Sequence, residues 1–174
     1  VYEKLEATSK GLEKTQILAD FLDKIKKEHV WEVVYFLQGR VFADYDEREF
    51  GISHQLVIKA ISKATGISDS DVVDGFKELG DLGKVAEDVL SNKKQSALFS
   101  KKLTTEKVLQ NLRKLPELEG KGTVSNKIDL IVELLHSGNP NEAKYIVRTV
   151  LGDLKVGVGS GLLRDAIVES CFKP

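Results

Sequence analysis

The chain has 174 residues, a formal net charge of −1 and a single cysteine, Cys171. This length suits one domain with a sizeable core, the lone cysteine excludes an internal disulfide, and no apolar run is long enough to cross a membrane. We therefore expect a soluble, intracellular protein of the cytoplasm, and the start at Val1 rather than methionine suggests a piece of a longer protein.

The charges are unevenly distributed along the chain. Residues 42–90 hold eleven acidic and five basic side chains, a local charge of −6, whereas residues 91–127 hold nine basic and three acidic ones, a local charge of +6. Such asymmetry can give one face a field that favours phosphates. Solvated helix surfaces of mixed sign explain it equally well.

Apolar residues recur at helical spacing almost throughout, for example in residues 17–25, 56–64 and 128–135. The pattern predicts an all-α fold of about ten to twelve short helices. Residues 30–37, VWEVVYFL, are rich in β-branched side chains, but no partner strand is visible elsewhere. We therefore expect a buried helix there.

Start and stop signals divide the pattern at short intervals. Candidate N-caps are Ser53, Ser68, Thr104, Ser125 and Asn139. Glycines stand where helices would end, at Gly39, Gly51, Gly66, Gly80, Gly120 and Gly138. The polar, basic segment 91–103 is the expected hinge between halves of about 1–90 and 104–174 within a single domain, and their similar layout hints at an internal pseudo-repeat.

The residues give no sign of a catalytic or metal site. Three histidines, His29, His54 and His136, lie far apart without the spacing of a metal site or a triad. The acidic segment YDEREF, residues 45–50, is well explained as a solvated loop. We expect no catalytic residue and no metal ligand in this chain.

Residues 151–165, LGDLKVGVGSGLLRD, place three glycines at alternate positions after a long helical pattern. A dinucleotide fingerprint would need glycine where Leu162 stands, and a phosphate loop would need Lys and Ser or Thr where Val158 and Gly159 stand. Two explanations remain open: bare backbone that approaches duplex phosphates and sugars, or a tight corner between two helices.

Basic side chains accompany these glycines. Lys144 and Arg148 are four residues apart and so share one helical face, and Lys155 lies among the glycines. These three cations fit the first explanation, but on spacing alone the two explanations stay equal.

Five segments in order resemble the amino-terminal DNA-binding domain of archaeal-type ATP-dependent DNA ligases, which are related to the eukaryotic replicative enzyme. The segments are LEATSKGLEKTQILADFL, FGISHQLVIKAISKATG, KELGDLGKVAEDVL, LTTEKVLQNLRKL and NEAKYIVRTVLGDLKVGVGSGLLRDAI. The resemblance therefore covers nearly the whole chain.

The resemblance implies an all-helical domain with two pseudo-symmetric halves that hold nicked double-stranded DNA across the minor groove. The full-length enzyme would then seal nicks with ATP and Mg²⁺ in replication, repair and recombination, through adenylation and OB domains that follow in the chain. The family's adenylated lysine lies in a Lys-x-Asp-Gly motif, and the nearest approach to that motif here, Val72-Val73-Asp74-Gly75, has valine in place of the lysine. We expect this chain alone to be catalytically inactive, without a cofactor, monomeric and associated with the nucleoid.

Carried over residue by residue, the family's contacts with DNA fall on three segments and the helix that precedes the last. They are Thr8, Ser9 and Lys10; Gly122, Thr123, Ser125 and Lys127; and Arg148, Gly152, Lys155, Gly157 and Gly159. Lys144 is added as a DNA contact because it shares the helical face of Arg148. Asp153 weakens a phosphate contact after Gly152, and Gly11 replaces a residue that is often basic, so Lys10 or Lys14 would serve. Ser125 is equally well explained as a plain N-cap, and we expect Gly161 to be a packing glycine at the start of the last helix.

Gln95, Leu98 and Phe99 resemble the short motif by which archaeal ligases dock on the sliding clamp, PCNA. The alternative is that both apolar side chains fill the core between the halves. An interaction scaffold that does not bind DNA is the alternative function for the whole chain.

Overall fold

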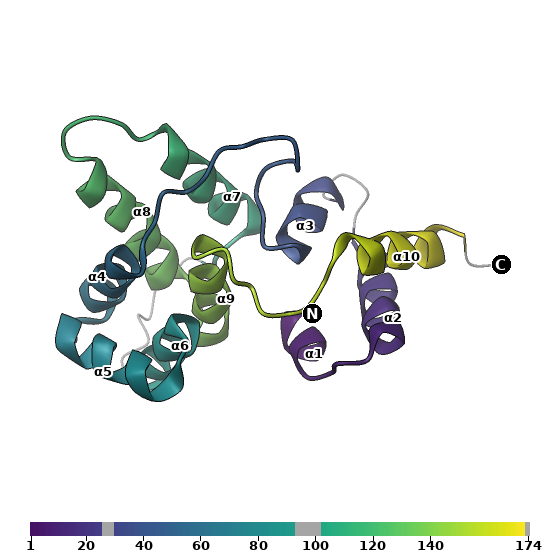
Figure 1. Ribbon diagram of the computed structural model, residues 1–174, viewed down its shortest axis with the longest axis horizontal. Helices are drawn as coiled ribbons and strands as arrows, with labels where there is room; N and C mark the ends of the chain where they lie inside the picture. The colour runs from purple at the N-terminus through teal and green to yellow at the C-terminus, as the bar shows by residue number, and fades with distance from the viewer. Residues whose placement is uncertain (26–29, 93–101, 173–174) are drawn as a thin grey trace. The chain divides into compact units, whose positions relative to one another are not determined.

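A computed structural model describes residues 1–25, 30–92 and 102–172 (Figure 1). These residues form ten α-helices and one 3-10 turn, with no strand among them, which confirms the all-α prediction. The elements are α1 (Tyr2–Glu6), α2 (Gly11–Leu22), α3 (Val30–Leu37), α4 (His54–Thr65), α5 (Asp69–Leu79), α6 (Leu82–Asn92), α7 (Thr105–Lys114), η2 (Leu115–Glu117), α8 (Thr123–Ser137), α9 (Pro140–Val150) and α10 (Ser160–Cys171). No helix in these ranges has the length and apolar character needed to span a membrane.

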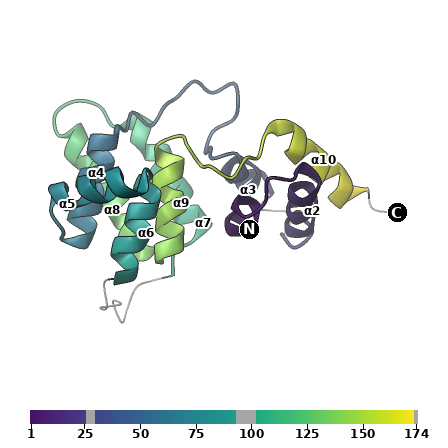
Figure 2. The same cartoon turned by 60° about the horizontal axis from the view of Figure 1, so that its bottom comes forward.

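The chain divides into two compact units. Unit 1 comprises Val1–Ala43 together with Leu154–Pro174, and unit 2 comprises Asp44–Asp153. This division differs from the expected halves, 1–90 and 104–174, because α10 packs against α2 although the two helices lie at opposite ends of the chain (Figure 2). The central part of the expected hinge, residues 93–101, lies outside the described residues.

Unit 1 builds its core from α1, α2, α3 and α10. Leu5, Leu18, Leu37 and Leu163 are among its buried side chains. Residues 30–37 form a helix as expected, so the β-branched content of that segment is overridden by its surroundings. The Tyr2 hydroxyl donates a hydrogen bond of 2.6 Å to the Phe36 carbonyl, and burial raises its pKa.

In unit 2, α6 packs against α9 and α4 against α8. The core includes Val57, Ile61, Leu112, Ile131 and Leu134, all at most 1% exposed. Helical periodicity in the sequence places these apolar residues on the inward faces of their helices.

Most of the predicted helix starts are confirmed. The side chains of Ser53, Ser68 and Thr104 accept hydrogen bonds from the backbone of their first turns. Asn139 forms a full capping box with Glu142 at the start of α9. The Ser125 cap is wrong, because α8 begins two residues earlier.

Candidate nucleic-acid interface

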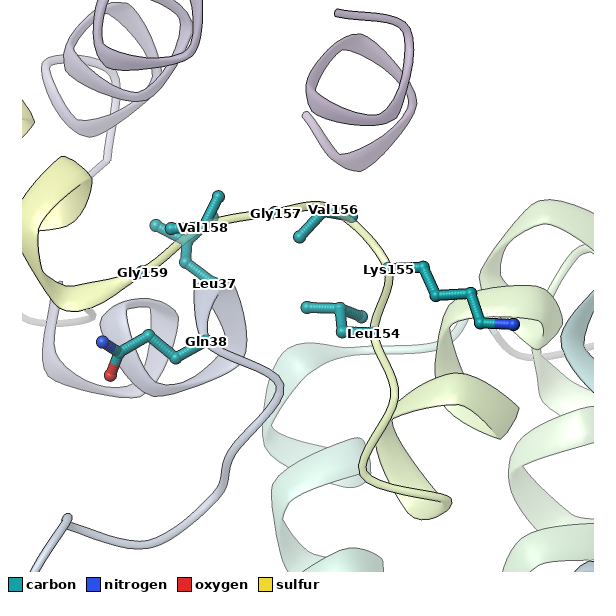
Figure 3. A pocket seen from close by; sticks show the side chains of 8 residues that line it. All are labelled: Leu37, Gln38, Leu154, Lys155, Val156, Gly157, Val158 and Gly159. Atoms are coloured by element: carbon teal, nitrogen blue, oxygen red, sulfur yellow. The ribbon is translucent and has the colours of Figure 1, made fainter. Parts of the chain in front are cut away.

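Residues 154–159 form an extended segment of unit 1 that enters α10; we call it the glycine strap. Leu154 and Val156 are 8% and 2% exposed, whereas Lys155, Gly157 and Gly159 are exposed. Buried anchors therefore alternate with bare or basic positions. The strap and the end of α3 line a shallow hollow, and Figure 3 shows the Lys155 side chain extending away from it.

Two neighbours fix the strap in place. The ammonium of Lys14, on α2, donates a hydrogen bond of 2.6 Å to the Val156 carbonyl. On the α3 side, a Cβ added to Gly39 would lie 3.1 Å from Leu154 Cβ, so the chain after α3 approaches the strap closely. The strap is held by the Val156 carbonyl and by the buried side chains of Leu154 and Val156.

The strap's glycines have different reasons to be glycine. Gly157 has φ 63°, and a Cβ there would lie 2.5 Å from the Lys14 ammonium. Gly159 is the N-cap of α10 with φ −89°, and a Cβ there would meet nothing within 4 Å. Gly161 is equally open, so the expectation that it is a packing glycine is wrong. Close helix packing thus explains neither Gly159 nor Gly161.

Lys155 has φ 59° and is the one residue other than glycine with a positive φ in the described ranges. A left-handed conformation costs an ordinary side chain about 1–2 kcal/mol, a cost that glycine avoids. Lysine at this position therefore carries backbone strain that glycine would avoid. Strain of this kind is typical of functional positions.

The structure brings the amino-terminal contact segment to the strap. Gly11, the first residue of α2, would place a Cβ 3.7 Å from Leu162 in the first turn of α10, and Lys14 reaches Val156. Residues 8–10, immediately before α2, therefore lie in the same region as the strap, although 144 or more positions separate them in sequence. Lys14 is 9% exposed and bonded to the strap, so of the two lysines considered for a DNA contact only Lys10 is at the surface.

An acidic residue shares this surface. The carboxylate of Glu13 accepts hydrogen bonds from the Lys10 ammonium, at 2.8 Å, and from the Thr8 hydroxyl, at 2.6 Å. These two bonds, the Lys10 bond first, hold the pKa of Glu13 below its usual range. Ser9 is exposed between its two neighbours. A phosphate that contacts Lys10 and Thr8 would compete with Glu13 for the same donors.

The second predicted contact segment begins α8 in unit 2. Gly122 is the N-cap with φ 88°, and the Thr123 hydroxyl donates to the Gly120 carbonyl at 2.6 Å. Ser125 is exposed in the first helical turn. Lys127 is half-buried, and its ammonium donates to the Phe50 carbonyl at 2.9 Å. The predicted residues of this segment do lie together, with the lysine engaged inside the unit.

Lys144 and Arg148 correct the sequence interpretation. Lys144 is 8% exposed and lies 3.1 Å from a carboxylate oxygen of Glu87, and Arg148 is 2% exposed and donates from Nε and Nη2 to one oxygen of Asp81. Their shared helical face points into the unit, where both charges are neutralised. The expectation that these two cations contact phosphates is wrong.

Gly152 follows α9 within unit 2 and is exposed with φ 71°. Its backbone N–H donates to the Thr149 carbonyl at 3.0 Å, and that of Asp153 donates to the Arg148 carbonyl at 2.9 Å. Gly152 therefore offers bare Cα surface to a partner and not a backbone donor.

The clamp motif and the three histidines are the other residues that the sequence singled out. Gln95, Leu98 and Phe99 lie outside the described residues, as does His29. His136 shares a hydrogen bond of 2.9 Å with the Ala64 carbonyl, and His54 packs on the Phe76 ring. The described ranges hold no group of three or more His, Cys, Asp or Glu side chains that could bind a metal.

Sequence reasoning missed Leu12, an apolar residue at the surface. Leu12, the second residue of α2, is 88% exposed beside Lys10. Helical periodicity does not distinguish a core leucine from an exposed one in a first turn, so no sequence signal identified it.

Comparison with known proteins identifies the family of this chain. The family described as DNA ligase N terminus matches residues 1–168. Proteins named DNA ligase from Methanosphaera stadtmanae, Thermococcus onnurineus and Nanoarchaeum equitans are 42%, 41% and 42% identical over 173, 170 and 167 residues, which are 98%, 98% and 96% of this chain. The matches cover 31%, 30% and 29% of those relatives, so the chain spans about three-tenths of their length. The chain belongs to the DNA ligase N-terminal family.

Proposed function

We propose that this chain is the DNA-binding part of an ATP-dependent DNA ligase and that it holds nicked duplex DNA across the minor groove. The observation that supports this most is the surface of unit 1, where the strained Lys155, two exposed glycines and residues 8–10 occur together. Contacts from glycine backbone and a few cations to phosphates and sugars carry no base sequence information. The binding is therefore independent of sequence.

The chemistry of sealing belongs to the remainder of the protein. The relatives are named DNA ligase, and the chain spans about three-tenths of their length. The nearest approach in this chain to the family's Lys-x-Asp-Gly motif, Val72-Val73-Asp74-Gly75, has valine in place of the lysine. ATP and Mg²⁺ are accordingly proposed for the full-length enzyme, and this chain alone is inactive in nick sealing. It acts as a monomer on nucleoid DNA in the cytoplasm, in replication, repair and recombination.

The test is a titration of the chain with fluorescent nicked duplex at several salt concentrations. Each phosphate contact lowers the logarithm of the affinity by about 0.9 per decade of salt, so the affinity should fall steeply. Two unrelated duplex sequences should bind equally well. Absence of binding, or a flat response to salt, would favour the interaction scaffold instead.

We also propose that Gln95, Leu98 and Phe99 dock on the sliding clamp. The support is their resemblance to the clamp motif and the four lysines that flank them, Lys93, Lys94, Lys101 and Lys102. A Phe99→Ala chain should lose clamp binding and keep its affinity for DNA. Loss of the folded state in that variant would assign Phe99 to the core instead.

A further inference from the structure

The segment that enters α4 in unit 2 repeats the strap that enters α10 in unit 1. The correspondence is Phe50 with Val156, Gly51 with Gly157, Ile52 with Val158, and Ser53 with Gly159. Both glycines are left-handed, with φ 61° and 63°, and the N-caps have φ −90° and −89° with ψ 164° and 168°. In both segments the glycine and the N-cap are exposed and the residue between them is half-buried.

A lysine holds each segment in the same way. Lys14 donates to the carbonyl before Gly157 at 2.6 Å, and Lys127 donates to the carbonyl before Gly51 at 2.9 Å. A Cβ on either glycine would come within 2.5 Å or 2.9 Å of that ammonium. The glycine, the carbonyl and the lysine thus form one device that occurs in both units.

The helices that carry these lysines also match. α2 packs against α10 in unit 1, and α8 packs against α4 in unit 2. The second residue of each lysine-bearing helix is a large apolar side chain at the surface: Leu12 is 88% exposed and Val124 is 55% exposed. Neither side chain contributes to the core of its unit. Each of these side chains lies on the helix whose lysine holds a bare backbone segment. An apolar side chain in this position suits the sugar edges of a nucleic-acid groove, which offer apolar surface between the phosphates.

We infer that residues 50–53, with Val124, form a second DNA-contacting surface, the counterpart in unit 2 of the strap with Leu12. The inference rests on the proposed function, since it transfers the role of the strap to its structural repeat. It adds Gly51, Ile52, Ser53 and Val124 to the contact residues. The acidic side chains of Glu47 and Glu49 precede this segment, which favours contact with sugars over contact with phosphates.

The two N-caps allow a matched test. Asp caps a helix about as well as Ser, and Gly159 has room for a side chain, so Ser53→Asp and Gly159→Asp should both fold. Each adds a negative charge where duplex DNA is expected to lie. Thr104→Asp, at the exposed N-cap of α7 in unit 2, adds the same charge elsewhere. With fluorescent nicked duplex, Ser53→Asp and Gly159→Asp should each weaken binding by about tenfold or more, and Thr104→Asp by much less.

The outcomes separate the inference from the proposed function. If Gly159→Asp weakens binding and Ser53→Asp behaves like Thr104→Asp, the repeat in unit 2 is structural only and the inference is overturned. If the unaltered chain does not bind duplex, or Gly159→Asp binds as well as it does, the proposed role of the strap fails. Thermal unfolding checks each variant. Should Ser53→Asp not fold, Val124→Asp tests the same surface, because an acidic residue is well tolerated in a first turn.

Discussion

Arg148 on α9 donates two hydrogen bonds, of 3.1 and 2.9 Å, to one carboxylate oxygen of Asp81, 67 positions earlier. The other oxygen of Asp81 accepts the backbone N–H groups of Gly83, at 2.8 Å, and Lys84, at 3.2 Å. One carboxylate thus caps the start of α6 and holds α9 against it. Lys144 and Glu87 form a second ion pair between the same two helices.

Replacing Arg148 with alanine should reduce stability rather than DNA binding. The change leaves the Asp81 carboxylate buried without its cation, which typically costs about 3–5 kcal/mol. Urea denaturation should show this loss in the free energy of unfolding. An Asp81→Asn, Arg148→Met double variant should lose less, because no charge is left uncompensated and the amide oxygen can still cap α6. If Arg148→Ala is as stable as the unaltered chain but binds duplex DNA more weakly, Arg148 contacts DNA after all.

Gly83 and Gly161 both lie in helices, but replacement by alanine should have opposite effects on stability at the two positions. A Cβ on Gly83 would lie 2.7 Å from the Lys144 carbonyl oxygen and 2.9 Å from Arg148 Cγ, whereas one on Gly161 would meet nothing. Gly83→Ala should therefore destabilise the chain by about 1–3 kcal/mol, as overpacking does. Gly161→Ala should stabilise it by up to about 1 kcal/mol. Thermal unfolding of both variants would measure the difference, and a tolerated Gly83→Ala would contradict the close approach of α6 and α9.

The helix caps of this chain could be predicted because they depend on hydrogen bonds between residues that are close in sequence. Ser68 and Asn139 cap helices through atoms within three residues, and the sequence shows those atoms side by side. The exposed glycines of the strap were also found, since bare backbone at a helix start is visible in the sequence. Family resemblance supplied the rest of the candidate surface.

The errors concern contacts between distant segments. Spacing correctly predicted that Lys144 and Arg148 share a helical face, but their partners lie 57 and 67 positions earlier and decide that this face points inward. The repeat of strap and lysine was likewise hidden. In unit 1 the lysine precedes the strap in the chain, and in unit 2 it follows, so no fixed period relates the two copies.

Lys155 offers a test that separates charge from backbone strain. Lys155→Gly removes the cation and the left-handed strain, so stability should stay level or rise by up to about 1 kcal/mol after the extra chain entropy of glycine is counted. Duplex affinity should fall, and the salt dependence should lose about one phosphate contact. Lys155→Ala should lose the same affinity without the gain in stability. If Lys155→Gly binds duplex as well as the unaltered chain, the lysine has no contact with phosphate.

Glu13 should limit the affinity of unit 1 for DNA. Its carboxylate accepts hydrogen bonds from Lys10 and Thr8. The Lys10 bond first, and then the Thr8 bond, lower the pKa of Glu13, so this carboxylate remains charged at neutral pH. Glu13→Gln removes this competitor and its repulsion of phosphate, so duplex affinity should rise by up to about fivefold, the range of exposed charge interactions. The advantage should vanish as the pH falls below the lowered pKa of Glu13, where the unaltered chain is also neutral at this position. The stabilising effect of the Lys10–Glu13 pair is lost over the same acidic range. A carboxylate whose pKa is lowered by folding stabilises fully above its unfolded pKa, and this effect is lost as the pH falls through the folded pKa.

Fluorescence titrations at neutral and acidic pH would measure the gain in duplex affinity and its loss in acid. The control is Glu3→Gln in α1, which removes an equal charge elsewhere in unit 1. An equal gain in both variants would mean that net charge, and not release of Lys10, raises the affinity.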